Sequence, residues 1–169
     1  MISRLACVLL FAAVFCANTA QSEPTVEVYF ERCTDAVVRE LSHAKQTVHV
    51  QAYSFTSAPI ARALTDAEER DVKVIAILDA SNRTRNYSAA DFLAHEGIET
   101  YIDSQHAIAH NKIIIIDGQT VLTGSFNFTK AAEENNAENL LVIHDAALAA
   151  KYEQNWQAHF RHSEYYAGR

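Results

Sequence analysis

Apolar and polar positions follow two periods along this chain, one typical of strands and one typical of helices. Alternating or continuous apolar runs predict strands over residues 26–30, 47–55, 72–78, 98–102, 113–116, 120–123 and 140–143. Apolar positions spaced by three and four residues predict helices over residues 34–45, after Ser57, up to about Glu96, and from Asp145 onward. The alternation of strands with helices indicates an α/β fold with a mixed β-sheet flanked by helices.

The first 22 residues are not expected to belong to this fold. Arg4 precedes a dense apolar run over residues 5–17, and Ala20-Gln21-Ser22 offers a small-x-small pattern for cleavage after about Ala20 or Ser22. This order predicts a secretory signal peptide over residues 1–22 and a single domain over residues 23–169. A retained membrane anchor is the alternative, but the apolar run is short for a spanning helix. We therefore expect a periplasmic or secreted protein with no stable membrane association after cleavage.

Cysteine content agrees with export and adds little. Cys7 and Cys16 lie in the predicted signal peptide, so Cys33 is alone in the domain and has no internal disulfide partner. We expect Cys33 to be a small buried residue, and an interchain disulfide stays open.

Charge argues against an extended basic surface. The chain has 14 Lys and Arg against 21 Asp and Glu, a formal net charge of −7. Proteins that bind phosphate-rich partners usually carry basic surface, so such a partner would require a local basic cluster here.

One polar pattern does supply such a cluster. In the stretch His-Asn-Lys-Ile-Ile-Ile-Ile-Asp-Gly-Gln-Thr-Val-Leu-Thr-Gly-Ser-Phe-Asn, residues 110–127, His110 and Lys112 lie on the same side of a strand. Asp117-Gly118 is a hairpin signal, so the returning strand brings Ser125 and Asn127 back to His110. An imidazole, an ammonium, a hydroxyl and a carboxamide then converge, and that set can hold and attack a phosphodiester.

The spacing His-x-Lys-x4-Asp-x6-Gly-Ser-x-Asn resembles the signature of the phospholipase D superfamily, and most of all its small single-motif bacterial endonucleases. The resemblance also covers residues 52–56, 126–132 and Glu138. It implies a phospholipase D-like fold and a reaction through a covalent phosphohistidine. It further implies that Glu138 hydrogen-bonds the second nitrogen of the nucleophilic histidine. A solvated glutamate in an acidic run is the alternative for Glu138.

Each motif residue has an expected role. His110 is the predicted nucleophile, and Lys112 a point-charge phosphate ligand. Ser125 and Asn127 are predicted to donate hydrogen bonds to phosphate oxygens, although a Gly-Ser-Phe-Asn turn also explains them. Asp117 is too far along the strand to touch the same phosphate. It is therefore a structural member of the motif, and Gly124 is placed with it.

Metal chemistry is not expected. His106 lies four residues before His110, a spacing that suits metal ligands on a helix, whereas the following residues predict a strand. No carboxylate cluster completes a site in the sequence. The resemblance likewise implies catalysis without metal or another cofactor.

The chain holds only one copy of the motif, because His43-Ala-Lys45 lacks the downstream residues. The superfamily mechanism uses two histidines, one that attacks and one that protonates the leaving oxygen. The resemblance therefore implies a homodimer with the active site at its two-fold interface.

These observations predict a metal-independent phosphodiesterase that hydrolyses nucleic acid, DNA or RNA, as a non-specific endonuclease. A phospholipid phosphodiesterase is one alternative, although no basic amphipathic helix for membrane docking is visible. A non-catalytic nucleic-acid-binding module is another.

Overall fold

The computed structural model describes residues 23–83 and 88–169, so the predicted signal peptide lies outside the described residues. Within them, eight strands form one sheet in the order β1-β7-β6-β5-β2-β3-β4-β8. The strands are β1 Thr25–Tyr29, β2 Thr47–Ala52, β3 Lys73–Asp79, β4 Glu99–Asp103, β5 Lys112–Ile116, β6 Thr120–Gly124, β7 Leu140–His144 and β8 Glu164–Tyr165. Only β2, β3 and β4 pair in parallel, and every other pair is antiparallel. The predicted mixed sheet is confirmed.

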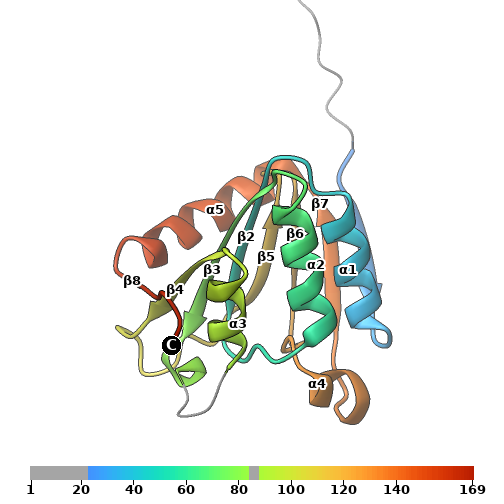
Figure 1. Cartoon of the computed structure of the whole chain (residues 1–169). Helices are drawn as coiled ribbons and strands as arrows, with labels where there is room; N and C mark the ends of the chain where they lie inside the picture. Colours follow the sequence, from blue (N-terminus) through green and yellow to red (C-terminus); the bar gives the residue numbers. More distant parts are fainter. Residues whose placement is uncertain (1–22, 84–87) are drawn as a thin grey trace, which may run out of the picture.

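Helices cover both faces of this sheet (Figure 1). They are α1 Cys33–Ser42, α2 Ala58–Glu68, α3 Ala89–His95, α4 Lys130–Asn135 and α5 Ala146–Phe160, with a 3-10 turn η1 at Ala80–Asn82. The first three pack on one face, and among the described helices only α5 packs on the other. None of the helices in the described part of the chain has both the length and the apolar character needed to cross a bilayer.

The unbroken isoleucine run of β5 follows from this layering. Ile114 and Ile116 belong to the core under α1 and α2, whereas Ile113 and Ile115 belong to the core under α5, around Trp156. A central strand buried on both faces needs apolar residues at every position, because neither face meets water.

The β5–β6 hairpin turns at Asp117-Gly118 as predicted. Both residues have positive φ, 53° and 62°, and Gln119 N donates to Ile116 O at 3.0 Å. Two successive left-handed residues give a turn whose twist matches that of the strands, which favours Asx-Gly. The turn fixes which β6 residues return beside Lys112.

Three predicted details were wrong. The second strand ends at Ala52 and not at Phe55, because Phe55 leaves the strand to pack edge-on against Phe128, with ring centroids 6.1 Å apart. The polar stretch after the motif contains α4, in which only Ala132 is buried, so no apolar period announces it. The two-residue β8 was also missed, since both its residues are exposed.

Candidate active site

A cavity of about 500 Å³ opens where β5 begins and β6 ends. It is lined by His110, Asn111, Lys112, Ile113, Thr123, Gly124, Ser125, Asn127 and Tyr152. The register explains this meeting, because Ile113 pairs with Thr123 and the residues just beyond them face the same opening. The structure thus brings together the imidazole, ammonium, hydroxyl and carboxamide of the motif.

Lys112 is the buried cation of this cavity. The residue is only 6% exposed, and Nζ donates to His110 O at 2.8 Å. Nζ also lies 5.0 Å from the centre of the Tyr53 ring, within the range of a cation–π contact. Burial lowers the pKa of Lys112, and the charge of Glu138 opposes part of this decrease. The cavity therefore holds a desolvated positive charge, which attracts an anion more strongly than a hydrated surface lysine does.

His110 is exposed and lies beside that cation. Its Nδ1 is 3.1 Å from Lys112 Nζ, and its ring centroid is 4.6 Å from that of Tyr53. An ammonium cannot accept a hydrogen bond, so Nδ1 is the acceptor, and a neutral imidazole then carries its proton on Nε2. Attack on phosphorus by Nε2 requires the other tautomer, with the proton on Nδ1.

Ser125 and Glu138 form a second polar pair. Ser125 Oγ donates to Glu138 Oε2 at 2.5 Å and accepts from Asn139 N at 3.0 Å. The other carboxylate oxygen of Glu138 accepts from Asn136 Nδ2 at 3.0 Å. Among the described residues no hydrogen bond joins Glu138 to His110, so the orienting contact implied by the resemblance is not made in this single chain.

Asn127 supplies an unused polar group. Its Oδ1 is buried and has no hydrogen-bond partner among the described residues. A buried unpaired amide costs free energy until a ligand or water satisfies it. Because Oδ1 is an acceptor, this unused group suits a donor, whereas a phosphate oxygen would need the amide Nδ2.

Comparison with known proteins agrees with this geometry. Residues 37–160 match a protein-family model described as "Cardiolipin synthase, PLD-like domain". The chain belongs to the phospholipase D superfamily, as the motif resemblance predicted.

Two solved structures of the superfamily share the fold over their full length. The phospholipase D family member Nuc from Salmonella typhimurium is 38% identical, with a TM-score of 0.80, over 85% of this chain and 99% of that one. NucT from Helicobacter pylori is 26% identical, with a TM-score of 0.79, over 85% and 100% of the two chains.

A curated relative carries a different name. The phospholipase D of Rickettsia felis is 44% identical over 124 residues, which cover 73% of this chain. The matched region spans 62% of that relative's length. The mitochondrial cardiolipin hydrolase of Xenopus laevis is 30% identical over 118 residues, 70% of this chain and 56% of that protein.

Asp117 and Gly124 of the superfamily motif do not present groups to the cavity centre. The Asp117 carboxylate accepts backbone N–H groups of Lys45, Gln46 and Thr47 at 3.0, 2.8 and 2.9 Å, which ties the start of β2 to the hairpin. At Gly124, a Cβ atom would lie 2.3 Å from Asn139 O, so only glycine lets the chain after β6 approach this carbonyl.

The sequence reasoning missed two aromatic residues at the site. Tyr53 lies over both His110 and Lys112, and its backbone N donates to Asn111 O at 2.8 Å. The sequence feature that could have identified Tyr53 is its position directly after β2, the strand that pairs with β5. Tyr152 lines the cavity from α5 and also packs against the core under that helix.

Proposed function

We propose that this chain is a metal-independent phosphodiesterase that hydrolyses nucleic acid as an endonuclease. The observation that carries the proposal is the meeting of exposed His110 with the buried Lys112 ammonium in one cavity. The match over the whole length of Nuc and NucT supports the nucleic-acid substrate. The positive charge of Lys112 provides a local site for phosphate binding on a chain whose net charge is negative.

The reaction proceeds in two displacements. Once Lys112 Nζ turns from His110 Nδ1 to the phosphate, the neutral imidazole can carry its proton on Nδ1, and the free Nε2 attacks phosphorus. An N–P bond forms, and the P–O bond to the leaving alkoxide breaks while a second, cationic histidine gives that alkoxide its proton. Water then attacks the phosphohistidine and passes a proton to the second histidine. The N–P bond breaks and His110 is regenerated. Lys112 Nζ and Asn127 Nδ2 hold the non-bridging oxygens as charge accumulates on them, and the Ser125 hydroxyl joins them once it turns from Glu138 to the phosphate.

The second histidine comes from a second copy of the chain. Within the described residues, His110 is the only histidine that lines the cavity, and a two-fold axis beside it brings its own symmetry mate. Ile108, two residues before His110, is 56% exposed and offers apolar surface for this contact. In such a dimer, Glu138 of one chain could hydrogen-bond a histidine of the other, a contact that is not made within one chain.

A phospholipid phosphodiesterase is the second candidate, favoured by the name of the 44% identical Rickettsia protein. The same chemistry serves both substrates, since each presents a phosphodiester.

Substrate tests in excess EDTA distinguish the candidates. Purified protein is incubated with plasmid DNA, RNA and phosphatidylcholine vesicles, below its melting temperature. We expect nicked and linear DNA and no released choline. Choline release without nucleic-acid cleavage assigns the phospholipid substrate instead, and cleavage that requires added magnesium contradicts the metal-independent reaction.

Mixed dimers test the shared site. Wild-type chains are exchanged with an excess of the His110→Ala variant, and exchange is followed by mass-tagged subunits. Heterodimers hold one histidine, so activity should fall well below the fraction of wild-type chains. Activity that falls only in proportion to dilution gives each chain a complete site and ends the dimer mechanism.

Export is proposed on the sequence of residues 1–22 alone. N-terminal sequencing of protein from periplasmic and culture fractions tests it, with a start near residue 21 or 23 expected.

A further inference from the structure

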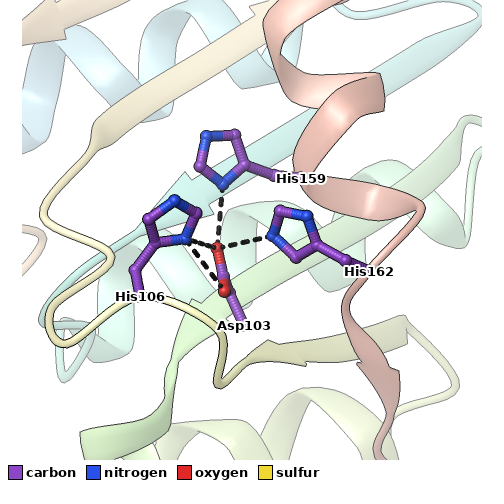
Figure 2. A group of neighbouring side chains, drawn as sticks. All are labelled: Asp103, His106, His159 and His162. Carbon is purple, nitrogen blue, oxygen red and sulfur yellow. Dashed lines mark hydrogen bonds and ion pairs between the residues drawn. The ribbon is translucent and has the colours of Figure 1, made fainter.

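Four side chains of types that can ligate a metal meet in one cluster (Figure 2), at the start of the loop that leads to His110. They are Asp103 at the end of β4, His106 in the following loop, His159 in the last turn of α5, and His162 just after that helix. None of them lines the catalytic cavity. The sequence had offered His106 only in combination with His110, whereas the fold places it beside Asp103 and beside His159 and His162, which lie more than fifty positions away.

The three imidazoles converge on one carboxylate oxygen, as Figure 2 shows. Asp103 Oδ2 lies 3.0 Å from His106 Nδ1, 2.8 Å from His159 Nδ1 and 3.2 Å from His162 Nε2. One oxygen has two lone pairs, so it cannot accept well-directed hydrogen bonds from three rings. His162 Nε2 is buried and, among the described residues, makes no hydrogen bond of acceptable geometry.

The same atoms have the spacing of a first coordination shell. With metal–nitrogen distances of about 2.0–2.1 Å, the corners of a tetrahedral site lie about 3.3 Å apart. The three O–N distances of 2.8–3.2 Å are close to that edge, and all four ligand atoms lie within 4.8 Å of one another. The ring nitrogens would have to draw together, by rotation of the rings, to close a tetrahedron around an ion.

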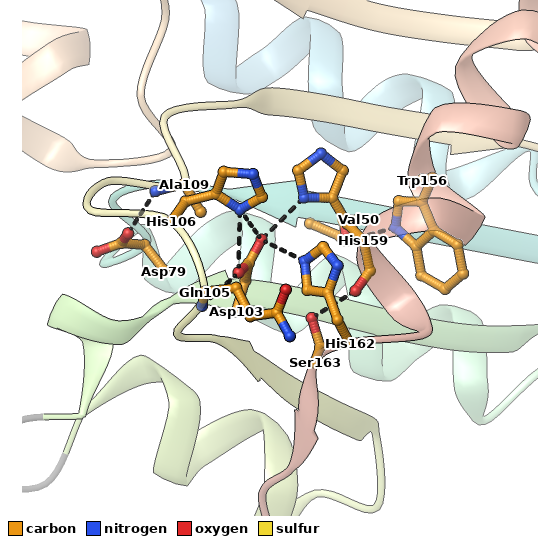
Figure 3. Close-up of polar contacts among 10 residues, drawn as sticks. All are labelled: Val50, Asp79, Asp103, Gln105, His106, Ala109, Trp156, His159, His162 and Ser163. Atoms are coloured by element: carbon orange, nitrogen blue, oxygen red, sulfur yellow. Dashed lines mark hydrogen bonds and ion pairs between the residues drawn. The ribbon is translucent and has the colours of Figure 1, made fainter.

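Neighbouring contacts hold the ligands in place (Figure 3). Trp156 Nε1 donates to Val50 O at 2.9 Å and fixes the last turns of α5 on the sheet. Asp103 is fully buried, and its Oδ1 accepts from Gln105 N at 3.1 Å. Further along the loop, Ala109 N donates to the Asp79 carboxylate at 2.7 Å. Such preorganisation lowers the conformational cost of binding an ion.

We propose that Asp103, His106, His159 and His162 bind one divalent transition-metal ion of the Zn²⁺ class as a structural site. Three imidazoles and one carboxylate suit Zn²⁺, Co²⁺, Ni²⁺ or Cu²⁺, whereas Mg²⁺ and Ca²⁺ take oxygen ligands. Four protein ligands close the shell, so the ion has no open position for chemistry. Bound there, it joins the end of α5 to the loop that ends at His110.

Metal uptake by chelator-treated, re-dialysed protein is the direct test. Co²⁺ is titrated in and followed by its visible absorption, and Zn²⁺ is then added in competition. We expect one ion per chain with the intense bands of tetrahedral Co²⁺, displaced by Zn²⁺. Zn²⁺ at 100-fold above its Kd should raise the melting temperature by about 5 to 10 °C. Absence of uptake, or weak octahedral Co²⁺ only, overturns the site.

Matched histidine variants locate the ion. His106→Gln removes a half-exposed loop ligand, so the protein stays folded, and His159→Gln removes a ligand of α5. Each should weaken binding by at least about 10- to 100-fold, the loss that even outer-shell changes cause. His43→Gln alters an exposed histidine directly after α1 and should leave metal affinity and stoichiometry unchanged. Undiminished uptake by His106→Gln places the ion elsewhere and contradicts the proposal.

The metal-site proposal and the proposed catalysis can be refuted independently of each other. The His110→Ala variant should bind the metal like the wild type while losing turnover. Metal-free wild type should still cleave phosphodiesters at temperatures where circular dichroism shows it folded, because no ligand of the ion lines the cavity. If Zn²⁺ does not stabilise the protein but cleavage persists, the ion site alone is refuted. If folded, metal-free protein does not cleave, metal-independent catalysis is refuted.

Discussion

Replacing Asp117 separates its structural role from a catalytic one. The carboxylate accepts three backbone N–H groups at 2.8–3.0 Å, from Lys45, Gln46 and Thr47. A hydrogen bond to a charged group contributes about 1.5–3 kcal/mol, but water replaces much of it where the N–H group is exposed. Only the Thr47 bond is partly buried, so we expect a total of about 2–4 kcal/mol. Alanine at the observed φ of 53° adds roughly 1 kcal/mol of strain.

Asp117→Ala should therefore lower the free energy of unfolding by about 3–5 kcal/mol, or the melting temperature by roughly 6 to 20 °C. Asp117→Asn is the matched control. It tolerates the left-handed conformation and keeps an oxygen for the N–H groups of Gln46 and Thr47, so its loss should be about 1–2 kcal/mol.

Thermal unfolding and the rate per folded molecule are measured together at 25 °C. Both variants should turn over at a rate within a few-fold of wild type, because Asp117 does not line the cavity. A melting temperature of Asp117→Ala within 2 °C of wild type would refute the hydrogen-bond argument, and loss of turnover in folded protein would refute the structural role.

Three further predictions concern two residues of the cavity, His110 and Lys112, and Glu138, which bonds to Ser125 at its edge. His110→Ala should abolish turnover, and it should melt within a few degrees of wild type because His110 is exposed. His43→Ala is its control. Residual turnover of His110→Ala above a few per cent of wild type would show that His110 is not the nucleophile. Glu138→Gln should slow the reaction by about 10- to 100-fold, which is less than the effect of losing His110. The amide can still accept a hydrogen bond, but it does not stabilise the imidazolium. An unchanged rate would show that Glu138 is a solvated surface residue without a part in the reaction. Burial lowers the pKa of Lys112, and the cationic form is present below that pKa. The reaction rate should therefore decline as pH rises, with a midpoint below the ordinary lysine value of about 10.4. Lys112→Arg stays charged and should lack this alkaline decline, and a decline that persists in Lys112→Arg belongs to another group.

The sheet and the motif hairpin were predictable because their signals are local. Ile113–Ile116 required burial on both faces, and Asp117-Gly118 required a tight turn, so the return of Ser125 towards His110 followed from strand geometry. These features depend on neighbours in the sequence and on the two-residue period of a strand.

What the sequence did not reveal depends on distant contacts. Tyr53 reaches His110 because β2 lies beside β5, and this neighbour relation is set by the whole sheet. His159 and Asp103 meet because α5 crosses the sheet towards the end of β4, a path that no spacing in the sequence encodes. The Glu138 contact with Ser125 likewise depends on how the segment after α4 returns to the sheet.

Trapping the covalent intermediate tests the central claim most directly. Wild-type protein at high concentration is mixed with a labelled oligonucleotide in EDTA and quenched in alkali, since phosphoramidate bonds hydrolyse in acid. The peptides are then analysed by mass spectrometry. We predict a nucleotide adduct on the peptide that holds His110, formed in a burst and absent from the His110→Ala variant. Rapid cleavage without any adduct, or an adduct on another residue, would contradict the account.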